Sequence, residues 1–394
     1  MHPQFIGMIS HRAQSETQPP APGVTMDPAY IARFAVAHEA AGFDRILIAW
    51  LSTQPDAMLV AAHAAASTTR IGLMVAHRPG FVAPTVAARA FATLDHLSGG
   101  RTAVHVITGG SPAEQGADGD FLDHDARYAR TDEYVGVMRR MWTEPAPFDH
   151  EGPHYRFARA FGEIKPLQRP HIPIYFGGSS DAAIAVAGRH ADVYAFWGET
   201  LDQARETIAK VRASVAAAGR DPAQVRFSIS FRPVLGATQE AAWQRADAIL
   251  ARILDLRGGV RATGNRSAES VGSARLLEAA RGGRVRDKLL WTEVAAAIGA
   301  GHNSTALVGT AEQVADTLAD YWAIGVDTFL IRGFDPLEDV AEYGRTLLPA
   351  TRAAIAARGV REAAEWKKAP GEVNSPGPPP FSACRRSAVT PARG

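Results

Sequence analysis

The sequence predicts an α/β fold, a closed (β/α)8 barrel of the TIM type, and three observations support that prediction. Short runs of apolar, β-branched and aromatic residues alternate with helical patterns along most of the 394-residue chain. Eight such runs occur, and their hydrophobicity is continuous, which indicates strands that helices bury on both faces. Eight successive strand–helix units predict a parallel barrel.

Signals for the start and end of helices separate the predicted strands. Asp27 and Pro28 fit the N-cap and the first residue of a helix. Residues 200–203 and 310–313 carry the Thr and Gln of a capping box, and Ser-Gly-Gly at 98–100 ends a helix. The eight strands are expected at residues 5–10, 45–50, 71–76, 102–108, 172–177, 193–197, 226–235 and 328–333.

Two insertions and a tail depart from the alternating pattern. Residues 143–171, rich in Pro, His and aromatic residues, lie between the fourth helix and the fifth strand. Residues 257–305 combine Gly/Arg-rich flanks with one apolar helix near 270–280, and their place before strand eight predicts a lid. One barrel domain is therefore expected over 1–366, followed by a disordered Pro-rich tail over 367–394.

The composition excludes several classes of protein. Apolar residues make up 46% of the chain and charged residues 21%, as in a globular protein with a large core. A formal net charge of +1 argues against non-specific binding of nucleic acid. The single cysteine, Cys384, lies in the tail, so neither a disulfide framework nor a cysteine-ligated metal is expected. Because no signal peptide or membrane-spanning run is recognisable, a cytoplasmic location is expected.

The C-terminal ends of the predicted strands are where a barrel of this type places its chemistry. These ends carry three histidines, two tryptophans and a cluster of hydroxyl groups, which suits a flat organic ligand with an anionic group. Each of these side chains also has an ordinary structural interpretation, as a packed or exposed residue. Arg232 is harder to explain in that way, because a guanidinium inside an apolar strand needs an anionic partner or water.

The stretch YFGGSSDAA (175–183) ends a buried strand with two glycines and two serines, just before a helical pattern. One interpretation is a tight turn followed by a helix cap, since serine satisfies free N–H groups at a helix start. The alternative is an anion site, because glycines let a ligand approach the backbone while the helix N-terminus offers N–H donors. Taken alone, the stretch favours the cap.

Segments spread over nearly the whole barrel resemble the luciferase-like flavin-dependent monooxygenases, and especially the two-component alkanesulfonate monooxygenases. The resemblance implies a luciferase-like barrel, reduced FMN (FMNH2) supplied by a separate NAD(P)H-dependent flavin reductase, and O2 as co-substrate in flavin C4a-peroxide chemistry. It also implies a homo-oligomer, a dimer or tetramer. The segments that carry it are 83–101 (APTVAARAFATLDHLSGGR), 107–134, 175–183, 197–199 (WGE), 305–310 (TALVGT) and 325–340 (GVDTFLIRGFDPLEDV).

The resemblance implies roles for individual residues at the cofactor. Gly178, Ser179 and Ser180 would bind the FMN phosphate, and Tyr128 would reach the same phosphate. His105 would lie near the flavin ring. The ring's faces would be lined by Ala76 and Thr108, and its edge would meet Asp56.

The chain departs from the alkanesulfonate enzymes where they bind substrate. Ser230 and Arg232 replace an Arg and a His on strand seven, and Phe334 replaces a tyrosine. Ala300 replaces the lid arginine and Gln54 a cysteine. Candidate catalytic residues are His11, Arg232 and His302, and candidate substrate residues are Trp197, Ser230 and Phe334.

The expected function is oxygenation of an alkanesulfonate or a related small organosulfur compound. Two alternatives stay open because the substrate-site residues differ. One is the same chemistry on a sulfone, amine or heterocycle. The other is a flavin-binding barrel without oxygenase activity.

Overall fold

Eight parallel strands close a barrel in the computed structural model, which describes residues 2–263, 270–301 and 303–368. Each barrel strand pairs in parallel with the next, and β9 closes the ring by pairing with both β8 and β13. The predicted fold and all eight predicted strands are confirmed. They are β1 (Gln4–Ile9), β2 (Arg45–Ile48), β3 (Gly72–His77), β4 (Thr102–Ile107), β7 (Ile174–Gly177), β8 (Val193–Trp197), β9 (Arg226–Leu235) and β13 (Thr328–Ile331).

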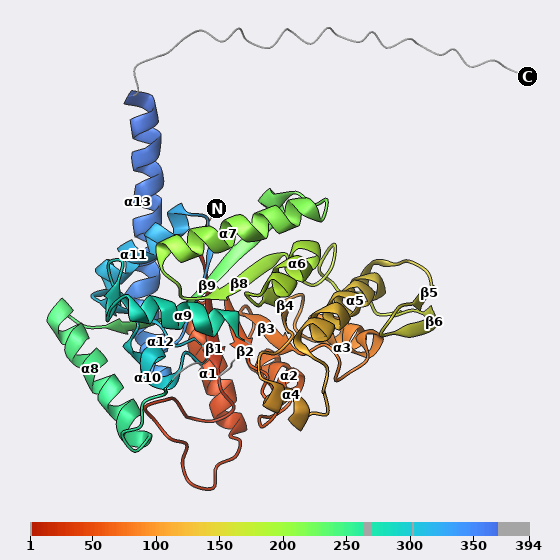
Figure 1. Cartoon of the computed structure of the whole chain (residues 1–394), viewed down its shortest axis with the longest axis horizontal. Coiled ribbons are helices and arrows are strands. Elements are labelled where there is room, and N and C mark those ends of the chain that lie inside the picture. Colours follow the sequence, from red (N-terminus) through yellow and green to blue (C-terminus); the bar gives the residue numbers. More distant parts are fainter. Residues whose placement is uncertain (1, 264–269, 302, 369–394) are drawn as a thin grey trace, which may run out of the picture. The chain divides into compact units, whose positions relative to one another are not determined.

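Helices surround these strands, and the predicted caps form (Figure 1). Asp27 caps α1 by accepting a hydrogen bond from the N–H of Tyr30. The capping boxes at Thr200 and Thr310 are both present, and α3 ends before Ser98. The helices are α1 (Pro28–Ala40), α2 (Ala57–Ser67), α3 (Pro84–Leu97), α4 (Pro112–Ala117), α5 (His124–Thr143), α6 (Asp181–His190), α7 (Leu201–Ala217), α8 (Gln239–Leu256), α11 (Ala311–Ala323) and α12 (Pro336–Arg345).

The last helix is α13 (Leu347–Lys368), and the chain divides into two units after Ala356. The units are Met1–Ala356, which holds the barrel, and Ala357–Gly394. Residues 367 and 368 of the predicted tail are the last two of α13, and the rest of the tail lies outside the described residues.

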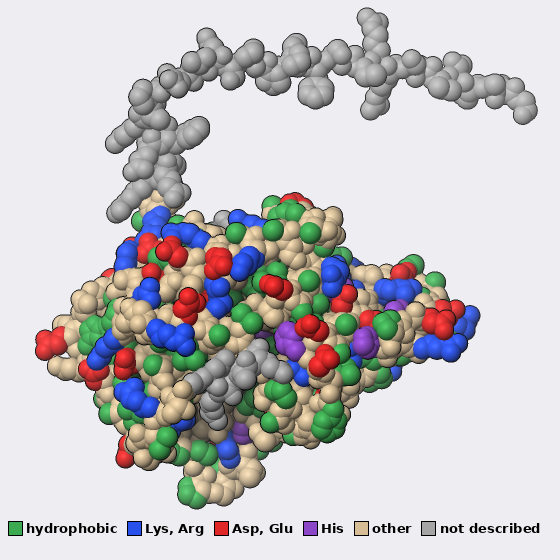
Figure 2. Space-filling view, viewed as in Figure 1, with side chains coloured by type: hydrophobic (Ala, Val, Ile, Leu, Met, Phe, Trp, Pro, Cys, Tyr) green, Lys and Arg blue, Asp and Glu red, His purple; other side chains and the backbone are tan. Residues whose placement is uncertain are grey.

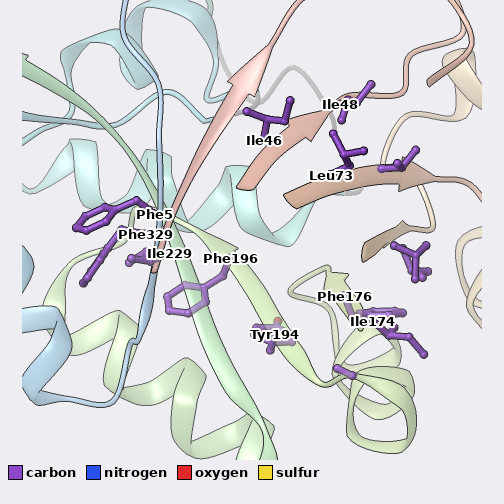
Figure 3. Packing of buried hydrophobic residues seen from close by; sticks show 14 of the residues in the cluster. Phe5, Ile46, Ile48, Leu73, Ile174, Phe176, Tyr194, Phe196, Ile229 and Phe329 are labelled. Carbon is purple, nitrogen blue, oxygen red and sulfur yellow. The ribbon is translucent and has the colours of Figure 1, made fainter. Parts of the chain in front are cut away.

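Alternate side chains of each barrel strand point outward to the helices or inward to the lumen. Outward side chains form the main core, and Figure 3 shows Phe5, Ile229 and Phe329 of neighbouring strands packed together. The rings of Phe5 and Phe329 lie 6.0 Å apart. The inward side chains Ile6, Met74, Ala103, Tyr175 and Val193 form a separate cluster inside the barrel.

The first insertion folds as a two-stranded antiparallel hairpin, β5 (Phe148–Glu151) and β6 (Arg156–Ala160). Glu133 of α5 fastens it, because its carboxylate accepts hydrogen bonds from His150 Nε2 at 2.8 Å and from two backbone N–H groups at 2.9 Å. The Pro-rich composition of 143–171 gave no signal for these strands.

The second insertion contains the predicted helix, α9 (Val271–Arg281), followed by β10 (Val285–Arg286), β11 (Leu290–Trp291) and α10 (Glu293–Ile298). A further strand, β12 (Ala306–Gly309), pairs in parallel with the second half of β9, from Arg232 to Leu235. β11 and β10 extend that edge as antiparallel strands. The insertion is therefore joined to the barrel sheet, and its residues 264–269 lie outside the described ones.

The surface carries charged side chains of both signs, as the formal net charge of +1 leads us to expect. On the face in Figure 2, Lys and Arg are interspersed with Asp and Glu. In the part of the chain that the structure describes, no helix is long and apolar enough to cross a membrane. The same residues include no group of three or more His, Cys, Asp or Glu side chains that could hold a metal ion.

Candidate functional site

The turn after β7 has a backbone that only glycine accommodates. Gly178 has φ +141°, a region that side chains rarely adopt. A Cβ atom there would also lie 2.7 Å from the Tyr128 hydroxyl and 2.8 Å from the Ala183 side chain. Tyr194 adds a further contact by donating a hydrogen bond from its hydroxyl to the Gly178 carbonyl. Two tyrosine hydroxyls approach this backbone closely, which explains why residue 178 is a glycine.

Ser180, two residues later, is the N-cap of α6. Its hydroxyl accepts a hydrogen bond from the N–H of Ala183 at 3.2 Å, which confirms the capping interpretation. The cap does not exclude the anion site, because the hydroxyl hydrogen of Ser180 and the side chain of Ser179 can still donate.

A pocket of about 330 Å³ lies beside these two serines. Lys210 of α7 and Arg275 of α9 bring two cations to it, and Asp181 brings one carboxylate. The first residues of α6 and of α9 both lie at this pocket, and helix N-termini favour anions. The lining residues are Ser179, Ser180, Asp181, Ile184, Tyr194, Thr207, Lys210, Val271 and Arg275.

Arg275 is fixed by two glutamates. Its Nε and Nη2 atoms donate to the buried carboxylate of Glu199 at 2.8 and 2.9 Å. Its Nη1 atom donates to Glu206 at 3.1 Å, and Glu206 also pairs with Lys210 at 2.8 Å. The pairing holds the start of α9 in place, so that a Cβ atom on Gly272 would lie 3.4 Å from Ser179 Oγ.

Solvent reaches some inward-facing side chains at the C-terminal ends of the strands. Inward-facing Met8, His105, Ala195 and Trp197 are partly exposed, while the residues on either side of each are buried. This alternation indicates a space that solvent reaches between the strand ends. The turn that leads to Ser179 packs against His105, because a Cβ atom on Gly177 would lie 3.4 Å from the His105 ring.

Two of the predicted ring-binding residues, Ala76 and His105, face the lumen from neighbouring strands. Ala76 and His105 are paired in the registers of β3 and β4, and Trp197 and Ser230 in those of β8 and β9. His105 is partly exposed as a residue, but its ring Nδ1 atom is buried. This burial lowers the pKa of the ring to about 4, so it is neutral at pH 7. Neither His105 Nδ1 nor Ser230 Oγ has a hydrogen-bond partner among the described residues.

Arg232 of β9 has the anionic partner that the sequence requires. Its Nη2 atom lies 2.8 Å from Glu16 Oε2 and donates to the Gly333 carbonyl at 2.7 Å. Its guanidinium lies over the Phe334 ring, 3.5 Å from the centroid. Burial lowers the pKa of Arg232 to about 10, which leaves the group charged at pH 7. Arg232 therefore covers the Phe334 ring. That Phe334 contacts a substrate stays a prediction.

The other predicted site residues lie at different places. His11 is buried after β1, and burial, followed by the charge of Arg12, lowers its pKa. Asp56 caps α2 and lies at the rim of a second pocket, of about 400 Å³, together with Gln54. The hydroxyl of Thr108 lies 3.1 Å from that of Thr131 on α5.

Tyr128 is buried, which raises its pKa and keeps the hydroxyl neutral. His302 lies outside the described residues, while Ala300 packs with Trp197 in a small apolar cluster.

Two residues of the site, Glu16 and Lys210, escape the sequence interpretation. Arg332 follows β13 and shares Glu16 with Arg232. Its position at a strand end is a signal that the sequence does offer. Lys210 and Arg275 lie within helical patterns, where a cation ordinarily indicates an exposed face.

Comparison with known proteins gives one family. The sequence pattern of the luciferase-like monooxygenase family matches residues 4–328. A riboflavin lyase, solved with modified FMN and its substrate riboflavin, is 23% identical, with a TM-score of 0.73 over 91% of this chain and 92% of that one. The EDTA monooxygenase of Chelativorans sp. BNC1 is 20% identical, with a TM-score of 0.66 over 91% and 95%.

A cofactor of another kind occurs among the similar structures. An F420-dependent secondary alcohol dehydrogenase, solved with an F420–acetone adduct, is 18% identical, with a TM-score of 0.64 over 89% of this chain and 99% of that one. At sequence identities of 18–23%, these similarities show a shared fold and nothing more.

Proposed function

The chain belongs to the family of luciferase-like monooxygenases, and from that premise we propose that it is an oxygenase that uses reduced FMN. The observation that carries the proposal is the pocket beside Ser179 and Ser180. Two cations, two helix N-termini and two serine hydroxyls surround it, which suits a phosphate ester. In this proposal Arg275 and Lys210 neutralise the phosphate charge while Ser179 and Ser180 donate hydrogen bonds.

The pocket also has groups that oppose an anion: Asp181 lines it, and Glu199 and Glu206 pair with its two cations. Glu206 is exposed and already pairs with Lys210 and Arg275, so a phosphate would compete with it for both cations. Glu199 keeps Arg275 charged and in position. The phosphate has an advantage over Glu206 in this competition, because it also accepts hydrogen bonds from the serine hydroxyls and backbone N–H groups.

The ring of the flavin would occupy the space at the strand ends that solvent reaches. Ala76 provides an apolar wall, and His105 is neutral and has a free ring nitrogen, so it can accept or donate one hydrogen bond at the ring. Reduced flavin supplies the two electrons that activate O2. The residues around it would bind and orient the ring, and Trp197 packs against α9 beside it.

The substrate in this proposal is an alkanesulfonate or a related small organosulfur compound. Arg232 and Ser230 support it, because both lie on β9 toward its C-terminal end and suit sulfonate oxygens. The Ser230 hydroxyl has no hydrogen-bond partner in the described part of the chain. A separate NAD(P)H-dependent reductase would supply the reduced flavin, and the chain would act as a homo-oligomer. A sulfone, an amine or a heterocycle remains an alternative substrate.

Oxygen consumption with purified flavin reductase tests the proposal. We expect uptake that depends on FMN, on NAD(P)H and on an organosulfur substrate, with the oxygenated product found by mass spectrometry. Riboflavin should support it poorly, because it lacks the phosphate. Flavin binding without substrate-dependent uptake would favour a flavin-binding barrel that has lost oxygenase activity. Binding and turnover with reduced F420 instead of FMN would overturn the choice of cofactor.

A further inference from the structure

Two arginines at the mouth of the barrel share one carboxylate. Glu16, on the irregular segment between β1 and α1, pairs through Oε2 with Arg232 at 2.8 Å and through Oε1 with Arg332. Arg232 is on β9, and Arg332 immediately follows β13, the neighbouring strand. The cluster therefore joins three separate parts of the chain at the end of the barrel where solvent reaches inward-facing side chains.

The cluster carries more positive charge than Glu16 can neutralise, and its hydrogen bonds are incomplete. Glu16 Oε2 lies 2.8 Å from Arg232 Nη2 but has no hydrogen-bond partner among the described residues. The Arg232 side chain is 1% exposed, yet its Nε and Nη1 atoms have no hydrogen-bond partner in the described part of the chain. Arg332 Nε and Ser230 Oγ are buried and unpartnered among the same residues. Two guanidinium groups and one carboxylate leave a formal charge of +1. Buried donor groups without a hydrogen-bond partner favour a ligand that accepts hydrogen bonds.

Glu16 is the replaceable member of the cluster. Its side chain is 29% exposed, whereas the backbone of Arg232 is fixed in the barrel sheet. The adjacent Thr17 anchors the segment by donating from its hydroxyl to the Phe334 carbonyl at 3.1 Å. The carboxylate can thus turn away by side-chain rotation while the backbone stays bound. Burial opposes the charge on Glu16, but the two arginines outweigh it and hold its pKa far below the usual value.

We propose that the Glu16 carboxylate holds the place of the substrate's acidic group and leaves both arginines when an organic carboxylate or sulfonate enters the lumen. The inference rests on the proposed function and adds the group, Glu16, that an acidic substrate would displace. Exchange of one anion for another keeps the charge of the cluster constant, so the arginines never face each other unneutralised. A neutral molecule offers no such exchange and leaves Glu16 in place.

The test is calorimetric titration of the full-length chain, with and without FMN, using three probes of similar size: butanesulfonate, pentanoate and the neutral butyl methyl sulfone. Glu16→Gln removes the competing charge and keeps the side-chain size. We expect it to raise the affinity for at least one of the two anions by about tenfold or more and to leave the sulfone unchanged. Arg232→Met should abolish anion binding. The preferred anion then distinguishes a carboxylate from a sulfonate substrate.

A matched control comes from the other end of the same strand. Arg226 of β9 pairs with Asp327 at 2.7 Å, so Asp327→Asn removes an equivalent carboxylate outside the mouth and should not change anion affinity. If Glu16→Gln does not fold, Glu16→Asp shortens the bridge and should strengthen anion binding in the same direction.

Anion affinity that is unchanged or lower in the Glu16 variant, or absent from every variant, would overturn the inference. FMN binding is measured separately, so a chain that binds the anions but no FMN would contradict the proposed function alone.

Discussion

Arg275 of α9 and Glu199 of the turn after β8 form a paired contact, Nε to Oε1 at 2.8 Å and Nη2 to Oε2 at 2.9 Å. The two residues are 76 positions apart in the chain. Glu199 is 1% exposed, so the arginine neutralises a buried charge. The contact ties the second insertion to the barrel beside Ser179 and Trp197, and it brings a cation to the predicted phosphate pocket.

Arg275→Met should loosen α9 and weaken FMN binding. The change leaves Glu199 buried without its partner, which costs roughly 3 kcal/mol of unfolding free energy. The phosphate also loses a cation, so FMN affinity should fall by about tenfold or more. Urea denaturation and FMN titration measure the two effects. Arg205→Met is the control, since Arg205 pairs with Asp202 on the exposed face of α7, where a pair contributes under about 1 kcal/mol. Equal effects of both substitutions would contradict the role of Arg275.

Replacing Ser179 and Ser180 by alanine separates capping from phosphate binding. The double variant should lose FMN affinity by about tenfold or more and change riboflavin affinity little, because only FMN carries the phosphate. Ser180→Ala should also cost about 1 kcal/mol of stability through the lost cap. Thr310→Ala removes the cap of α11 and should cost a similar amount without affecting FMN. If FMN and riboflavin weaken equally, the serines serve only the helix.

Gly178→Ala should be far more harmful than alanine at another glycine with positive φ. Its Cβ atom would meet the Tyr128 hydroxyl at 2.7 Å, so the turn has to shift and both stability and FMN affinity should fall. Gly219, at φ +74°, has no atom within 4 Å of an added Cβ, so Gly219→Ala reports the backbone cost alone, about 1 kcal/mol. The comparison uses urea denaturation and FMN titration. Similar losses for both would show that the tyrosine contact does not matter.

Stability should rise with pH between about 4 and 6.5. Burial lowers the pKa of His38 and of His77 from 6.5 to about 4, so both are neutral in the folded chain while the unfolded chain binds their protons. Each histidine contributes a slope of up to about 1.4 kcal/mol per pH unit in this window. His77→Phe should lower the overall stability, since its hydrogen bond to Tyr134 is lost, and should reduce the slope. A slope that the substitution leaves unchanged would contradict the assignment.

The second insertion should resist trypsin when the site is filled. If residues 257–305 form a lid, FMN together with a turned-over substrate should slow cleavage within them several-fold. Cleavage sites identified by mass spectrometry provide the measurement. The ion pairs of Arg275 and Arg284 predict that Arg257 or Arg281 is cut before them. Cleavage that no ligand changes would mean that the insertion is a fixed part of the barrel.

Local patterns determined the barrel. Continuous apolar runs and capping residues are properties of neighbours in the chain, so the eight strands, the caps at Thr200 and Thr310 and the turn at Gly178 could all be predicted. The hairpin at 148–160 could not, because its strands are short and partly exposed and are held by Glu133 of another element.

Tertiary structure alone decided how the charges of the site are shared. Arg232 was recognisable as a cation that needs a partner, but the sequence does not say that the partner is Glu16 or that Arg332 competes for it. Nor does it say that α9 begins beside α6 and brings Arg275 to the same pocket. The reason is physical. Secondary structure follows from nearest neighbours, whereas an ion pair requires only that two side chains meet in space, and the closed barrel brings together residues hundreds of positions apart.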